Sequence, residues 1–234
     1  VTRVAKLVEW LSVNWATGVV WGDGIQIDDD YFDRTYGVGH KEICLPFHGF
    51  DHAAFDPVDP HEYDDVTITY AGSFYEGWIE PYRFLDGLAD HVDDHGTDGL
   101  TVQFYGDWRP EYRDAAADRG VADVIESHEF VPHEEIVPVL KGSDLLLYVG
   151  GDDPQNRLNV PSKIWDYVGA RRPILAVVDP TFRVAELIDE YDMGTVVDPD
   201  DTAAIADVIG AVREGRYDYD PDPAAFEFTR DRKV

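Results

Sequence analysis

The chain has 234 residues, and its 48 acidic residues outnumber its 19 basic residues to give a formal net charge of -29. With 44% hydrophobic and 13% aromatic residues it can bury a core, which excludes a disordered acidic tail. A sequence pI near 4.3 excludes nucleic-acid binding through a basic face and docking on anionic lipid through a polybasic surface.

The acidic balance is typical of proteins adapted to molar salt, because Asp far exceeds Glu and Arg exceeds Lys. At about 1 M salt the Debye length falls to ~3 Å, so repulsion among the excess carboxylates is screened. We therefore expect a halophilic cytoplasmic protein, with peripheral attachment at the cytoplasmic membrane face as an alternative. No apolar run approaches the ~18 residues of a transmembrane segment. The single cysteine, Cys44, excludes an internal disulfide and predicts a buried, inert thiol.

Residues 1–50 predict part of one α/β domain. Apolar side chains at helical spacing predict a helix over 3–15. Strands are expected over 17–21 and 42–47, with a short helix over 28–36 between them. Residues 51–65 hold prolines, acidic residues and histidines with little periodicity, which predicts an interdomain linker.

From residue 66 onward the pattern becomes regular, and apolar strands alternate with helices. Strands are expected over 66–71, 100–105, 124–130, 144–149, 173–178 and 194–197. Helices are expected over 81–95, 111–119, 133–140, 161–170, 183–191 and 200–212. This alternation predicts an α/β fold with a doubly wound, Rossmann-like parallel sheet covered on both faces. Ligands of such sheets bind at the carboxyl ends of strands, which here carry the loops at Gly72, Gly106, 130–133 and 150–163.

Residues 159–176 resemble the signature of family 4-like glycosyltransferases with the GT-B fold. Ser162 and Lys163 open a helix, Asp166 and Tyr167 follow one turn later, and Pro173 leads into the next strand. Four further segments resemble the family in the same order along the chain: 36–57, 130–135, 140–147 and 198–201. The resemblance implies a partial N-terminal, acceptor-side domain over 1–50, a linker over 51–65, and a C-terminal donor-binding domain over 66–234. It also implies that both ends are truncated relative to the family.

The resemblance implies a site for a nucleoside diphosphate sugar. Ser162 and Lys163 would bind the diphosphate, because free N–H groups and the dipole at a helix start attract anions. Asp166 would bind the ribose hydroxyls. The remaining candidates are Gly72, Ser73 and Arg109 for the diphosphate, Phe130, Val131 and His133 for the base, and Asn156, Arg157 and Asn159 for the donor-sugar loop.

The implied chemistry is glycosyl transfer to an unknown acceptor, without a metal or other cofactor. Many members of the family use lipid-linked acceptors, and retaining stereochemistry is implied. The sequence departs from the family at Leu158, which stands where retaining members carry the donor-sugar carboxylate. It also departs in the loop over 72–78, which holds no basic residue.

Two alternatives to a transferase stay open: a sugar-nucleotide epimerase on the same scaffold, and a non-catalytic fragment that binds a nucleotide sugar. The Asp-x-Asp pattern over 28–30 is a weak metal candidate, since Asp clusters are expected in so acidic a chain. His128 and His133 lack an adjacent cysteine and are a weak zinc pair.

Overall fold

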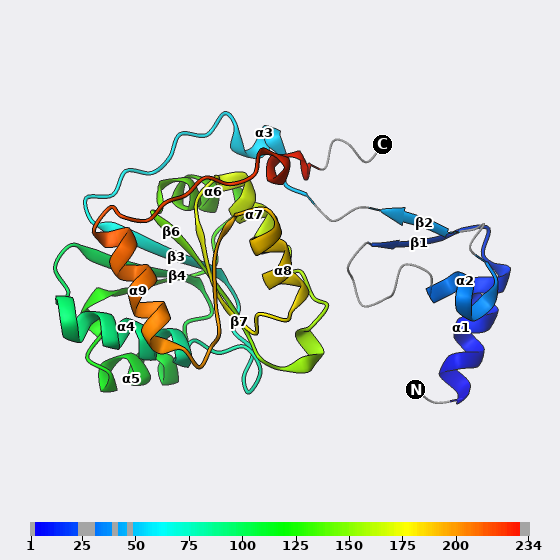
Figure 1. Cartoon of the computed structure of the whole chain (residues 1–234), viewed down its shortest axis with the longest axis horizontal. Coiled ribbons are helices and arrows are strands. Elements are labelled where there is room, and N and C mark those ends of the chain that lie inside the picture. The colour runs from blue at the N-terminus through cyan, green and yellow to red at the C-terminus, as the bar shows by residue number, and fades with distance from the viewer. Residues whose placement is uncertain (1–2, 23–30, 39–41, 46–48, 230–234) are drawn as a thin grey trace.

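The computed structural model describes residues 3–22, 31–38, 42–45 and 49–229. Residues 49–229 form an α/β unit around a six-stranded parallel sheet (Figure 1). The strands are β3 (Val66–Gly72), β4 (Leu100–Gly106), β5 (Ile125–His128), β6 (Leu145–Gly151), β7 (Ile174–Val178) and β8 (Gly194–Val197). Their order across the sheet is β5-β4-β3-β6-β7-β8, which confirms the predicted doubly wound parallel sheet.

Six helices cover the two faces of this sheet (Figure 1). One face carries α4 (Tyr82–His95), α5 (Pro110–Asp118) and α9 (Thr202–Arg213), and the other carries α6 (His133–Gly142), α7 (Lys163–Ala170) and α8 (Arg183–Glu190). Because side chains alternate along a strand, Leu147 packs beneath α4 and α9 while its neighbour Leu146 packs beneath α6 and α7. Both leucines have no exposed surface, as expected for strands that are apolar through their length.

The strand order reverses between β3 and β6, which is where ligands bind in doubly wound sheets. Residue pairing between these two strands covers Ile68 with Leu145 and Thr69 with Leu146. Farther along β3, the amide of Ala71 donates instead to the hydroxyl of Tyr167 in α7, at 3.1 Å. The same hydroxyl donates to the carbonyl oxygen of Leu147 in β6 at 3.0 Å, so a side chain bridges the two strands where their pairing ends.

The segment predicted as a linker contains a short helix, α3 (His52–Phe55). Asp51 caps it by accepting a hydrogen bond from the amide of Ala53 at 2.9 Å, and Phe55 is buried in the core beneath α6 and α7. The Nζ of Lys141 donates to the carbonyl oxygen of Phe55 at 2.8 Å. One turn of helix is too short to show a 3.6-residue period, so sequence patterning misses it. The predicted domain boundaries at residues 51 and 65 stay a prediction.

The N-terminal described residues form α1 (Arg3–Trp15), β1 (Val19–Gly22), α2 (Tyr31–Tyr36) and β2 (Glu42–Leu45). The two strands pair in parallel, with Val19 opposite Glu42. The two helices and two strands expected here are confirmed, with ends that coincide with the expected ones or differ by up to three residues. The metal candidate over 28–30 and the side chain of Cys44 lie outside what the structure describes.

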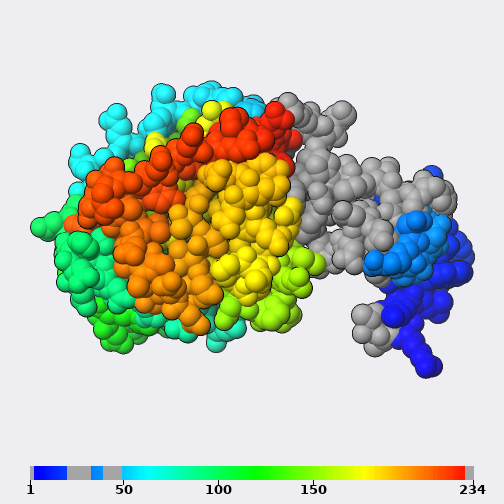
Figure 2. Space-filling model, in the orientation of Figure 1, coloured from blue at the N-terminus to red at the C-terminus, as the bar shows by residue number. Residues whose placement is uncertain are grey.

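The C-terminal segment returns to the α/β unit through a short 3-10 helix, η4 (Pro223–Glu227), which lies over α7 (Figure 2). The ring of Phe228 lies 5.3 Å from that of Trp165, and the carbonyl oxygen of Phe228 accepts a hydrogen bond from the amide of Phe50 at 3.1 Å. This segment therefore fixes the solvent side of α7, the helix that begins at Lys163. None of the helices in the described ranges reaches the length and apolarity that crossing a bilayer requires.

Candidate functional site

Two cavities meet at Lys163, beside the point where the strand order reverses. The first, which we call the Phe130 cavity, has a volume of about 170 Å³ and is lined by Ala71, Gly72, Tyr105, Phe130, Val131, Ile136, Leu140, Lys163, Asp166 and Tyr167. The second, the Ser162 cavity, has a volume of about 190 Å³ and is lined by Tyr70, Ser73, Tyr75, Ile79, Tyr148, Val149, Asn159, Pro161, Ser162 and Lys163. Lys163 is the residue that the two linings share. A ligand that spans both cavities must pass its side chain.

The amine of Lys163 is enclosed by protein atoms. It lies 4.0 Å from the centroid of the Tyr70 ring, over the ring face, where the π-electrons attract a cation. Burial favours the neutral amine and lowers the pKa of Lys163 from its ordinary 10.5 to about 7. The sequence predicts a fully charged lysine at this position. The structure instead holds an amine that gains or loses its proton near neutral pH.

Gly72, the last residue of β3, allows this approach of the lysine. Its φ of +138° is a backbone conformation that side chains other than glycine rarely adopt, and a Cβ there would lie 2.4 Å from Lys163 Nζ. At the matching end of β4, a Cβ on Gly106 would lie 2.3 Å from the carbonyl oxygen of Gly72. Both strand ends therefore need glycine because other atoms occupy the space of a Cβ.

We expect the substitution Gly72→Ala to displace the amine of Lys163 toward water and to raise its pKa from about 7 toward 10.5. NMR titration of the lysine side-chain resonances measures this shift. Gly77→Ala is the matched control, because Gly77 also has positive φ but has open space around its Cβ position. Gly77→Ala should lose about 1 kcal/mol of stability because its backbone is left-handed, and Gly72→Ala should lose up to about 3 kcal/mol because its φ of +138° is almost confined to glycine. An unchanged pKa of Lys163 in Gly72→Ala would contradict this arrangement.

Asp166 and His133 are hydrogen-bonded to each other at the mouth of the Phe130 cavity. Asp166 lies three residues after Lys163 in α7, and His133 is the first residue of α6. The Nε2 of His133 lies 3.0 Å from the Oδ1 of Asp166. Phe130 is 64% exposed and lies on the loop that leads to α6. The structure thus brings together the residues that sequence analysis assigns to the base and the ribose.

The start of α7 leaves backbone donors for a ligand. The amides of Ile164 and Trp165 donate to the carbonyl oxygens of Pro161 and Ser162, at 3.1 Å each. The amides of Ser162 and Lys163 donate to no residue in the described part of the chain. Free amides at a helix start carry partial positive charge, which suits an anion beside Lys163.

Three other candidates lie apart from Lys163. The Nε of Arg109 donates to Asp107 Oδ2 at 2.9 Å, and Arg109 lines neither cavity. Asn156 is buried, and its amide donates to the carbonyl oxygen of Gly150 at 3.4 Å. The side chain of Arg157 is exposed. The roles assigned to these residues stay predictions that their surroundings do not favour.

Sequence analysis missed the tyrosines that line the two cavities. Tyr70 and Tyr148 lie on β3 and β6, Tyr75 lies on the loop after β3, and Tyr105 lies near the end of β4. An available signal was that aromatic residues at the carboxyl ends of adjacent parallel strands project toward the ligand edge of the sheet. In the described residues no group of three or more His, Cys, Asp or Glu side chains could hold a metal ion.

No family model matches the chain, and no curated protein matches it significantly. Solved structures do match. With WaaG, a glycosyltransferase involved in lipopolysaccharide biosynthesis, the TM-score is 0.60 at 14% identity over 81% of this chain and 53% of WaaG. With Anabaena Alr3699/HepE in complex with UDP-glucose, the TM-score is 0.62 at 14% identity over 90% and 58% of the two chains.

A third match is the lipopolysaccharide outer core galactosyltransferase WaaB, with a TM-score of 0.60 at 14% identity over 93% of this chain and 59% of WaaB. The chain spans about half the length of the solved structures it matches. Its fold is therefore that of one half of a GT-B glycosyltransferase, which confirms the fold that the sequence resemblance implies. At identities this low the comparisons establish the fold alone.

Proposed function

We propose that the chain binds a nucleoside diphosphate sugar at Lys163 and acts as the donor-binding part of a glycosyltransferase. The nucleoside occupies the Phe130 cavity and the sugar occupies the Ser162 cavity. The observation that carries the proposal is that Lys163 is shared by both cavities, because a diphosphate that joins the two ends of such a ligand must then lie against its amine. Binding of UDP and UDP-glucose by HepE, which has the same fold, supports this class of ligand.

The residues at the start of α7 suit the departure of a nucleoside diphosphate. In glycosyl transfer the bond between the anomeric carbon and the diphosphate oxygen breaks, the acceptor oxygen bonds to that carbon, and negative charge builds up on the diphosphate. The protonated amine of Lys163 and the free amides of Ser162 and Lys163 lie where they can stabilise this charge. Asp166 gives up its contact with His133 and accepts hydrogen bonds from the ribose hydroxyls instead.

Calorimetric titration of UDP, GDP and their glucose conjugates into the chain at about 2 M KCl, a concentration that screens its net charge, tests donor binding. We expect micromolar affinity for one nucleotide class. Asp166→Ala should weaken binding about ten-fold, which is the net loss of about one hydrogen bond to a carboxylate, because Asp166 gives up its bond to His133 when it binds the ribose. Asp207→Ala is the matched control, because Asp207 is an exposed carboxylate on α9, outside both cavities.

Two outcomes would overturn the donor site: a folded chain that binds none of these nucleotides, or an Asp166→Ala variant that binds as tightly as the unmodified chain. Epimer formation from the sugar nucleotide without any acceptor would favour the epimerase instead. Transfer to a sugar or lipid-linked acceptor is the corresponding test of the transferase activity.

A further inference from the structure

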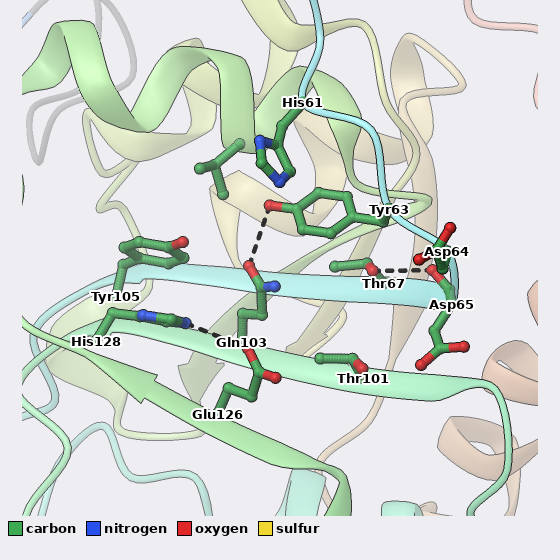
Figure 3. Close-up of a pocket in the computed structure, with 11 residues that line it drawn as sticks. His61, Tyr63, Asp64, Asp65, Thr67, Thr101, Gln103, Tyr105, Glu126 and His128 are labelled. Carbon is green, nitrogen blue, oxygen red and sulfur yellow. Dashed lines mark hydrogen bonds and ion pairs between the residues drawn. The ribbon is translucent and has the colours of Figure 1, made fainter.

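We propose that a groove on the α6 side of the sheet, separate from Lys163, binds an uncharged saccharide unit. The groove has a volume of about 320 Å³, within the range of small-molecule sites. It is lined by His61, Tyr63, Asp64, Asp65, Thr67, Thr101, Gln103, Tyr105, Glu126, His128 and Val139. We call it the Gln103 groove (Figure 3). Tyr105 also lines the Phe130 cavity, so one tyrosine forms a wall of both sites.

The floor of the Gln103 groove is polar where the rest of this sheet face is apolar. Beneath α6 to α8 the central strands present residues such as Leu146 and Ile174. Farther toward the β5 edge, the same face presents Gln103, which is 5% exposed, and Thr67, which is 0% exposed. Buried amides and hydroxyls are costly unless they are hydrogen-bonded. A floor of this kind suits water or a polar ligand and not a packed helix.

Gln103 holds a donor available for such a ligand. Its Oε1 accepts a hydrogen bond from the hydroxyl of Tyr63 at 3.2 Å, and Figure 3 shows the two side chains meeting at the centre of the groove. Its Nε2 donates to no residue in the described ranges. Burial raises the pKa of Tyr63 to about 12, so its hydroxyl stays protonated at neutral pH. A side-chain amide with a free N–H group pairs well with a sugar hydroxyl, which both donates and accepts.

Two ring pairs form the walls. The rings of Tyr105 and His128 stack with their centroids 4.3 Å apart and an interplanar angle of 15°. The ring centroids of His61 and Tyr63 lie 4.5 Å apart, on the segment that leads into β3 (Figure 3). The faces of aromatic rings carry negative potential, which attracts the polarised C–H groups on one face of a pyranose ring. The aromatic rings can therefore pack against the C–H groups of a saccharide, and the free amide of Gln103 can bond to its hydroxyls.

Charge decides against a phosphorylated ligand. The lining contains the carboxylates of Asp64, Asp65 and Glu126 and no Lys or Arg. The three carboxylates are exposed, so they repel anions while the floor stays neutral. The Nε2 of His128 is buried and lies 3.6 Å from Glu126 Oε2, so His128 contributes its ring to the wall and not a hydrogen bond to a ligand. An uncharged sugar is not repelled by the carboxylates and can hydrogen-bond to the neutral floor.

Saturation-transfer-difference NMR with methyl α-glucopyranoside, methyl β-galactopyranoside and maltose tests the groove, with glucose 1-phosphate and spermidine as charged probes. We expect at least one neutral saccharide to bind, and glucose 1-phosphate to bind at least about ten-fold more weakly. Spermidine is attracted by the acidic surface in general and should not displace the bound saccharide. Gln103→Leu and Glu126→Ala should each weaken saccharide binding about ten-fold. Glu129→Ala is the matched control, an exposed carboxylate just beyond β5 that does not line the groove.

Lys163→Met separates this site from the donor site, because Lys163 does not line the Gln103 groove. Saccharide binding should be unchanged in this variant. The proposal would be overturned by any of three results: no neutral saccharide binds, binding persists in Glu126→Ala, or binding disappears in Lys163→Met. Displacement of the bound saccharide by spermidine would also overturn it, in favour of a cationic ligand.

Discussion

Replacing Lys163 with methionine is expected to stabilise the chain and, at the same time, to weaken binding of a nucleoside diphosphate sugar by at least about 100-fold. Methionine fills a similar volume without an amine, so the substitution removes the cost of enclosing a charge. It also removes the cation that faces the diphosphate in the proposed complex. Thermal unfolding and calorimetric titration of the same variant measure the two effects.

The sign of the stability effect follows from the pKa of Lys163. In the folded chain it is about 7, below the ordinary 10.5. Between these values the unfolded chain holds a proton that the folded chain has released, so the lysine destabilises the fold less as pH rises. The stability gained in Lys163→Met should therefore be largest at and below pH 7 and should vanish near pH 10.5. We expect on the order of 3 kcal/mol at pH 7, less than the full pKa difference implies because the side chain retains some exposure.

Lys141→Met is the matched control for this experiment. The amine of Lys141 donates to the carbonyl oxygens of Phe55 and Val58, so its loss should destabilise the chain by about 1 kcal/mol and leave nucleotide binding unchanged. The substitutions Lys163→Met and Lys141→Met are thus expected to change the stability of the chain in opposite directions. A Lys163→Met variant that is less stable than the unmodified chain at pH 7 would show that the amine is not desolvated.

Donor binding at pH 8 is expected to take up about one proton. With a pKa of about 7, most Lys163 amines are neutral at pH 8 in the free chain, and a diphosphate placed beside the amine favours the charged form. UDP-glucose is the suitable ligand, because its diphosphate does not titrate near this pH. Calorimetry in phosphate and in Tris, which differ in ionisation enthalpy, gives the number of protons taken up.

The uptake should disappear in Lys163→Met, at whatever affinity remains measurable, and should fall toward zero at pH 5.5, where the free amine is already protonated. Affinity for UDP-glucose should accordingly decrease as pH rises from 7 to 9. Equal heats in the two buffers at pH 8, after correction for dilution, would place the diphosphate away from Lys163.

The sheet, its order of elements and the centre of the candidate site were predictable from the sequence, because local signals specify them. Ser162 and Lys163 open a helix, and Gly72 ends a strand, at the edge where parallel sheets bind ligands. The hydrogen bond between His133 and Asp166 joins residues 33 positions apart, yet the family resemblance had assigned both to one site.

The properties of the site that the sequence could not predict depend on contacts between residues that are distant along the chain. The depressed pKa of Lys163 results from burial against Tyr70 and Gly72 of β3, far earlier in the chain, so a lysine at a helix start was expected to be charged. Arg109 was a candidate for the diphosphate because it is one of few cations, and only the fold shows that Asp107 pairs with it. The Gln103 groove has no motif, because residues from three strands, helix α6 and the linker form it.

The hydroxyl of Tyr167 accepts a hydrogen bond from the amide of Ala71 in β3 and donates one to the carbonyl oxygen of Leu147 in β6, at 3.0 Å. The hydroxyl thereby takes the place of a direct backbone hydrogen bond between β3 and β6, at the point where the two strands separate. The tyrosine ring acts as a spacer of fixed length, and it belongs to the helix that begins at Lys163. The separation of the two strands is therefore tied, through this one side chain, to the position of the helix that carries the lysine.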